Sequence, residues 1–157
     1  MLSLLLRNFF FTLLQPGIVA GLVPYWILRG KAKHILAQSL HWQQYFGALV
    51  CLAGFMVMLS CIINFAVKGR GTLSPLDPTK RLVATGLYKF SRNPMYLGVM
   101  MILIGEALFF QSAALWKYVV IVFAAFHAFI LLHEEPRLKK DFGESYLQYC
   151  KRVRRWI

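Results

Sequence analysis

The chain has 157 residues, of which 59% are hydrophobic and 15% are charged, and 18 Lys and Arg against 6 Asp and Glu give a net charge of +12. This length fits a single domain, residues 1–157. The apolar fraction lies above the ~45–50% of ordinary soluble domains and excludes a disordered chain or a fibrous repeat. Nucleic-acid binding is disfavoured as well, because the Lys and Arg form no stripe alternating with exposed aromatic residues.

Long uncharged segments predict an all-α integral membrane bundle of four transmembrane helices. No charged residue lies in the 21 positions between Arg7 and Arg29, or in the 34 positions between Lys33 and Lys68. A helix needs about 20 apolar residues to cross a bilayer. We therefore predict spans at about 9–28, 45–67, 95–110 and 115–132. The last two share a turn at Gln111–Ser112, which predicts a tight helical hairpin.

The charges beside the spans predict the orientation in the membrane. With a cytoplasmic N-terminus, the cytoplasmic segments hold 14 Lys and Arg and the opposite side holds 4. Cytoplasmic loops of membrane proteins are enriched in these residues. We therefore expect a multi-pass protein of the bacterial inner membrane, with both termini and the 68–94 loop in the cytoplasm. The first apolar run continues to Leu28, beyond the length of a typical signal peptide, so we interpret it as a retained helix.

The start of the third span has features of an anion site. Asn93 is a good N-cap residue, and Pro94 suits the first turn of a helix. The first turn also presents free backbone N–H groups that attract anions, and Arg92 adds a positive charge beside them. The alternative is an ordinary capped helix whose arginine extends to the membrane interface.

Two adjacent acids, Glu134 and Glu135, follow the fourth span. Carboxylates are unfavourable at a helix C-terminus, and the chain has only six acids, so this pair suggests a cationic ligand. The alternative is an acidic pair held by nearby Lys and Arg. A tight hairpin would bring both acids close to Arg92 and Tyr96. The sequence therefore predicts one cytoplasmic pocket for a ligand with an amine, a carboxylate and a flat apolar part.

These motifs together resemble a known family. The run from Gly86 to Gly98, with Arg92-Asn93-Pro94-Met95-Tyr96-Leu97-Gly98, is followed by Glu134-Glu135 and by Phe142-Gly143-Glu144. It resembles the isoprenylcysteine carboxyl methyltransferase and phospholipid N-methyltransferase group of integral membrane enzymes over residues 69–157. The resemblance implies S-adenosyl-L-methionine as cofactor on the cytoplasmic side and a lipophilic acceptor that enters from the bilayer.

The resemblance also implies the residues of the site. The cofactor contacts would be Lys80, Arg81, Leu82, Val83, Tyr88, Asn93, Pro94, Met95, Tyr96, Gly98 and Glu134. Arg92 and Glu135 are the candidate catalytic residues. Asn93 stands where the family usually has histidine, and Ile130 stands where the prenylcysteine enzymes have an arginine for the substrate carboxylate. The acceptor is therefore left open. Methyl transfer from a sulfonium depends mainly on positioning in a dry pocket, so no general base is assigned.

Two polar residues inside the spans are substrate-side candidates. Glu106 lies in the third span, where an unpaired charge costs about 2.5–3.5 kcal/mol. His127 lies in the fourth span and is expected to be able to pair with it across the hairpin. The pair would either polarise the substrate or hold the hairpin together through a neutral hydrogen bond.

The tail after Pro136 has apolar residues at helical spacing, at Leu138, Phe142, Tyr146, Tyr149 and Val153. It predicts an amphipathic helix at the membrane surface, which would close the cofactor pocket or serve as an anchor. The three cysteines show no metal-ligand spacing, and no metal site is expected. Two other functions stay open: a sterol-reductase-like membrane oxidoreductase that uses NADPH, and a non-catalytic small membrane protein or transporter subunit.

Overall fold

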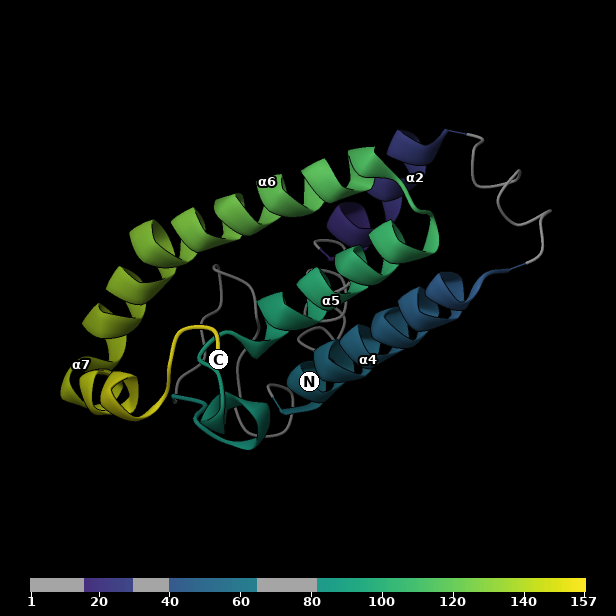
Figure 1. Ribbon diagram of the computed structural model, residues 1–157. Coiled ribbons are helices and arrows are strands. Elements are labelled where there is room, and N and C mark those ends of the chain that lie inside the picture. Colours follow the sequence, from purple (N-terminus) through teal and green to yellow (C-terminus); the bar gives the residue numbers. More distant parts are fainter. Residues whose placement is uncertain (1–15, 30–39, 65–81) are drawn as a thin grey trace, which may run out of the picture.

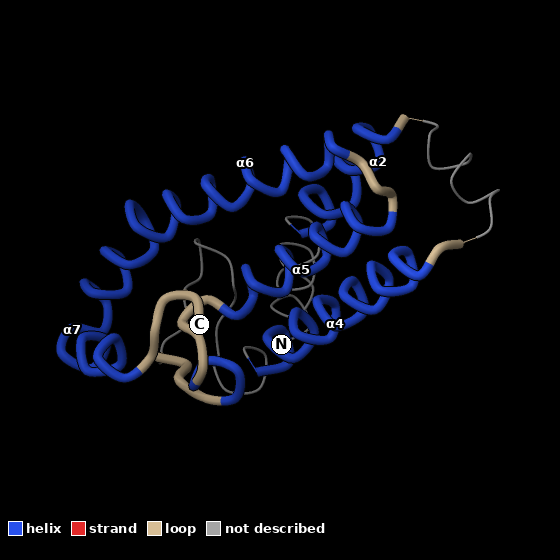
Figure 2. Tube along the Cα trace, in the orientation of Figure 1, coloured by secondary structure: helices blue, strands red, loops and turns tan. Residues whose placement is uncertain are grey.

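The computed structural model describes residues 16–29, 40–64 and 82–157 (Figure 1). The described chain is built of helices and connecting loops, without a strand (Figure 2). The all-α prediction is thereby confirmed for this part of the chain. The elements are η1 (Ile18–Leu22), α2 (Val23–Leu28), α4 (Trp42–Asn64), η3 (Gly86–Lys89), α5 (Pro94–Phe109), α6 (Ala113–Phe129), η4 (Ile130–Glu134) and α7 (Glu135–Arg152).

Two helices are long and apolar enough to cross a membrane. They are α4, with 23 residues, and the continuous helix Ala113–Arg152, with 40 residues. Ile18–Leu28 and α5 are apolar but shorter. Large apolar side chains on α4, among them Leu49 and Leu52, are exposed, as expected for a surface in contact with lipid. Part of the first predicted span lies outside the described residues, so a bundle of four crossings stays a prediction.

Four glycines form the contact between α4 and α5. Gly47 and Gly54 of α4 face Gly105 and Gly98 of α5, and the two glycines on each helix are seven residues apart. A Cβ atom on Gly54 would lie 2.7 Å from the carbonyl oxygen of Gly98, and one on Gly47 would lie 2.7 Å from that of Gly105. The two backbones therefore touch, an approach that small residues permit in membrane helices. This contact fixes the direction of α5, whose first turn belongs to the candidate site.

Helices α5 and α6 form a hairpin that is packed closely at its turn. The turn passes through Gln111, which has a φ of 46°. Near the turn, Leu115 and Val119 of α6 are buried in the core, and the Tyr118 hydroxyl donates a hydrogen bond to the carbonyl of Val19 at 2.9 Å. Further along, α6 diverges from α5 (Figure 1). The two helices nevertheless meet again at the far end of the hairpin, where the ring centroids of Tyr96 on α5 and Phe126 on α6 lie 4.8 Å apart, so the predicted hairpin is present.

Helix α6 continues without a break through the π-helical turn η4 into α7. Such π-helical turns occur often at functional sites, and this one ends at Glu134. Helix α7 contains a kink at Gly143, where φ is 51°. It buries Tyr146 and Tyr149 and exposes Lys139 and Lys140. The predicted tail helix is thus present, and its location at a membrane surface stays a prediction.

Candidate functional site

A half-buried carboxylate at the end of η4 meets the first turn of α5. The Tyr96 hydroxyl donates a hydrogen bond to Glu134 Oε2 at 2.8 Å, and the Tyr96 ring contacts the ring of Phe126 with centroids 4.8 Å apart. Burial raises the pKa of Glu134, although the Tyr96 hydrogen bond and the charge of Arg137 act in the opposite direction. The fold thus holds a carboxylate in a place where a cationic partner would stabilise its charged form.

Tyr88 lies on another side of this carboxylate. Its side chain is buried with Cys61 and Val83, and Met95 packs against the same cluster. The Tyr149 hydroxyl donates a hydrogen bond to the Tyr88 carbonyl at 2.6 Å, which ties η3 to α7. Burial raises the pKa of Tyr88 well above its ordinary value, and the nearby Glu134 contributes in the same direction. The Tyr88 phenol therefore stays neutral beside Glu134.

The structure brings several predicted cofactor contacts to this end of the bundle and separates others from it. Val83, Tyr88, Met95, Tyr96 and Glu134 lie in the two adjoining groups just described, and Leu82 packs against the neighbouring cluster around Tyr146. Gly98 faces α4 instead, where a Cβ atom would lie 3.0 Å from the carbonyl oxygen of Gly54. Lys80 and Arg81 lie outside the described residues.

The two adjacent glutamates have different partners. Glu135 Oε1 lies 3.3 Å from the Arg92 guanidinium and 2.7 Å from Arg155 Nε, and Arg155 Nη2 donates to Glu135 Oε2 at 3.0 Å. Burial alone would raise the pKa of Glu135, but the Arg155 hydrogen bonds and the charge of Arg92 lower it overall. The predicted approach of the acidic pair to Arg92 and Tyr96 is confirmed, with Tyr96 bound to Glu134 and Arg92 to Glu135.

The start of α5 is as predicted, but the role of Asn93 differs. Pro94 is the first residue of the helix and Asn93 is the N-cap residue, yet the Asn93 side chain makes no capping hydrogen bond. Its Nδ2 group donates to the carbonyl of Arg155 at 3.0 Å instead. Arg92 is also engaged, since its Nη1 group donates to Cys150 Sγ at 2.8 Å. The predicted anion site at this helix start is therefore covered by residues of the C-terminal segment.

The expected pairing of Glu106 with His127 is wrong. His127 Nδ1 accepts a hydrogen bond from the Trp156 indole N–H at 3.2 Å, and Glu106 Oε2 is buried without a hydrogen-bond partner in the part of the chain that the structure describes. The physical reason is the antiparallel hairpin. Glu106 lies five residues before Gln111 and His127 lies sixteen after it, so the offset along the helices is about 16 Å at 1.5 Å per residue.

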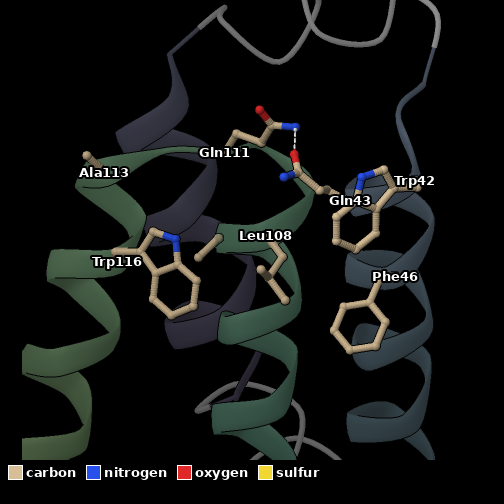
Figure 3. A pocket seen from close by; sticks show the side chains of 8 residues that line it. Trp42, Gln43, Phe46, Leu108, Gln111, Ala113 and Trp116 are labelled. Carbon is tan, nitrogen blue, oxygen red and sulfur yellow. Dashed lines mark hydrogen bonds between the residues drawn. The ribbon is translucent and has the colours of Figure 1, made fainter.

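A separate hollow lies at the other end of the bundle (Figure 3). It has a volume of about 540 Å³, and Gln111 Nε2 donates to Gln43 Oε1 across it at 2.9 Å. Its lining comprises Trp42, Gln43, Phe46, Ala107, Leu108, Gln111, Ala113 and Trp116. It contains none of the predicted site residues and is separated from Tyr96 by most of the length of α5, about 20 Å.

Sequence reasoning missed the residues that cover the start of α5. Cys150, Arg155 and Trp156 come from the last part of the chain and contact Arg92, Glu135 and His127. Their partners are 20 to 58 residues away in sequence. A local pattern holds no signal for such contacts. In the sequence, Arg155 and Trp156 are a cation and an aromatic residue that follow the last apolar helical position. Such a pair indicates only that the segment lies at a membrane surface.

An apolar helical bundle with a half-buried carboxylate beside two tyrosines has the chemistry of a membrane protein that holds a cationic ligand at one end. Residues 42–145, about two thirds of the chain, match the profile of the phospholipid methyltransferase family. The chain belongs to that family, and the resemblance stated from the motifs is confirmed. Family and apolar helices together make it a membrane protein of a methyltransferase family.

Comparison with individual proteins adds less. The chain is 33% identical over 63 residues to an uncharacterised protein of Haemophilus influenzae, an alignment that covers 40% of this chain and all of that protein. No solved structure matches the chain.

Proposed function

We propose that the chain is an integral membrane methyltransferase that uses S-adenosyl-L-methionine and acts on a lipophilic acceptor from the bilayer. The observation that carries the proposal is the half-buried Glu134 carboxylate, hydrogen-bonded to Tyr96 at 2.8 Å in a chain of the phospholipid methyltransferase family. Family membership supports the reaction class. The chemistry of the residues around Glu134 supports the choice of cofactor.

The residues present fit this cofactor. Glu134 would bind its α-amino group, because an ammonium group stabilises the charged form of a carboxylate whose pKa is raised by desolvation. The rings of Tyr88 and Tyr96 would lie against the positive sulfonium by cation–π attraction. Val83 and Met95, which pack with Tyr88, would provide apolar surface and exclude water. When bound, S-adenosyl-L-methionine supplies a methyl group on a leaving group that is already activated.

The proposal changes the expected roles of Arg92 and Glu135. Both were candidates for catalysis, but each holds the other at 3.3 Å, and Glu135 also receives two hydrogen bonds from Arg155. Because the charges of a carboxylate and a guanidinium joined in this way offset each other, the pair attracts a charged ligand only weakly. We therefore assign them as positioning residues, which fix the backbone on either side of Tyr96 and Glu134.

The acceptor would approach along the part of α6 that leads to Glu134. Phe123 and Phe129 are exposed on this part of α6, as suits a surface in contact with a hydrocarbon chain. With the predicted orientation, the cofactor would bind from the cytoplasm. The reaction then depends on holding the acceptor atom in line with the methyl group, and positioning of this kind supplies a large part of the rate.

Ligand binding to purified protein in detergent tests the proposal. S-adenosylhomocysteine should bind and NADPH should not, as measured by calorimetry. Glu134→Gln should weaken binding about tenfold or more, because it removes a charged hydrogen-bond partner worth about 1.5–3 kcal/mol. Asp141→Asn is the matched control, since it neutralises an exposed acid on α7.

Activity is measured as transfer of label from S-adenosyl-L-methionine to a total lipid extract of the expression host. Binding of NADPH in place of S-adenosylhomocysteine would overturn the proposed function. Wild-type affinity of Glu134→Gln for S-adenosylhomocysteine would overturn the assignment of Glu134 alone.

A further inference from the structure

The last five residues, Val153–Ile157, form a non-helical segment that we call the strap. It begins where α7 ends, since Val153 has φ −125° and ψ 129°, and it returns to the start of α5 (Figure 1). The backbone N–H of Arg92 donates to the carbonyl of Arg154 at 3.0 Å. The carbonyl of Arg155 accepts from Ser91 Oγ at 3.3 Å and Asn93 Nδ2 at 3.0 Å. The strap lies beyond the residues that match the family, 42–145.

Two side chains attach the strap to other elements. Arg155 makes two hydrogen bonds to Glu135, at 2.7 and 3.0 Å, and this binds it to the first residue of α7. Trp156 donates to His127 Nδ1 at 3.2 Å and lies over the rings of His127 and Phe123, with centroids 6.2 and 5.2 Å away. The strap therefore connects the start of α5, the end of α6 and the start of α7.

These contacts place an aromatic wall beside the proposed site. Phe123 is 44% exposed, and Trp156 is half-buried against it. His127 is four residues before Leu131, at the end of α6 that leads into Glu134. An indole with an apolar face and one hydrogen-bonded N–H suits the boundary between hydrocarbon and polar surroundings.

We propose that the strap positions the acceptor. Trp156, which packs against α6, forms one wall of the entrance for the acceptor, and the Arg155–Glu135 ion pair holds Trp156 in place. The inference rests on the proposed function, because it assumes an acceptor that approaches along the face of α6 on which Phe123 is exposed. It adds a determinant of acceptor binding that is distinct from the cofactor contacts. Trp156 touches the hydrocarbon part of the acceptor, and Arg155 acts through Glu135 and the start of α5 as a positioning residue.

Variants of the two side chains test the proposal in the full chain. Trp156→Ala should raise the apparent KM for the host lipid extract about tenfold, while S-adenosylhomocysteine affinity stays at the wild-type value. Trp156→Phe keeps an aromatic ring and should give a smaller rise. Arg152→Ala is the charge-matched control for Arg155→Ala, because Arg152 is exposed at the end of α7.

Hydrogen exchange measures the strap without any ligand. Arg155→Ala should speed exchange of the amide of Arg92, which is bonded to the strap, whereas Arg152→Ala should not. Arg155→Lys should restore part of the protection, because it keeps the charge but not the two-pronged geometry.

Any of three results would overturn the inference. The first is a KM for the lipid extract that is the same in Trp156→Ala and Arg152→Ala, and the second is a loss of S-adenosylhomocysteine affinity in Trp156→Ala as large as its rise in lipid KM. The third is wild-type exchange of the Arg92 amide in Arg155→Ala. Failure of the proposed function itself would be recognised separately, as absence of S-adenosylhomocysteine binding by the wild type.

Discussion

The contact between α4 and α5 allows one prediction to be worked out in detail, the replacement of Gly54 by alanine. The new Cβ atom would lie 2.7 Å from the carbonyl oxygen of Gly98 and 2.8 Å from the backbone nitrogen of Ile102. Both are backbone atoms and cannot rotate away, so the helices must separate by about 0.7 Å to reach ordinary contact near 3.4 Å. Overpacking of this kind lowers the free energy of unfolding by about 1–3 kcal/mol. The higher helix propensity of alanine offsets up to about 1 kcal/mol of this loss.

The net expectation is that Gly54→Ala lowers the free energy of unfolding by about 1–2 kcal/mol. Circular dichroism during heating in detergent should show a midpoint lower by about 2–8 °C. Gly21→Ala is the matched control, because no atom of residues 16–29, 40–64 or 82–157 lies within 4 Å of its added Cβ, and its midpoint should be unchanged or slightly higher. Equal midpoints for the two variants would refute the reasoning that the two helix backbones touch at these glycines.

Two further predictions concern Glu134 and Tyr149. Burial raises the pKa of Glu134, so it takes up a proton at a higher pH than an ordinary glutamate, near 4.3. Because an ammonium group binds the charged form, S-adenosylhomocysteine affinity should fall as pH drops through that raised pKa, and calorimetry of Glu134→Gln should show no such fall; an equal fall in both proteins would contradict this. Tyr149→Phe leaves the Tyr88 carbonyl without its 2.6 Å hydrogen bond and should cost about 1–2 kcal/mol in thermal unfolding. Tyr25→Phe, at a residue that is 71% exposed, should cost nothing measurable, and similar losses in the two variants would count against the role of this bond.

Much of the candidate site could be predicted from local patterns. Pro94 at the first position of a helix and the paired acids after the fourth span are both local signals, and the structure places the helix start and the acids where they were expected. The convergence of Glu134 with Tyr96 followed from the hairpin, because two antiparallel helices of similar length must bring their far ends to the same side. The same antiparallel geometry excludes the predicted pairing of Glu106 with His127, because Glu106 lies near the turn and His127 lies far from it.

The sequence could not predict that Glu134 and Glu135 have different partners. Adjacent residues on a helix point in directions about 100° apart, and which direction faces Tyr96 depends on how α6 and η4 are rotated relative to α5. That rotation depends on packing, including the strap contacts of Arg155 and Trp156. A family resemblance names both acids without saying which of them is engaged by arginines.

The sequence by itself determined the membrane-type composition, the helical class, the limits of most helices and the motif that identifies the family, because hydrophobic runs and short motifs are local properties. Only the tertiary structure decided two things: the glycine contact between α4 and α5, and the return of residues 153–157 over the start of α5. Each joins residues far apart in the chain. Such contacts depend on shape and on which polar groups find partners, and neither can be read from the order of the residues along the chain.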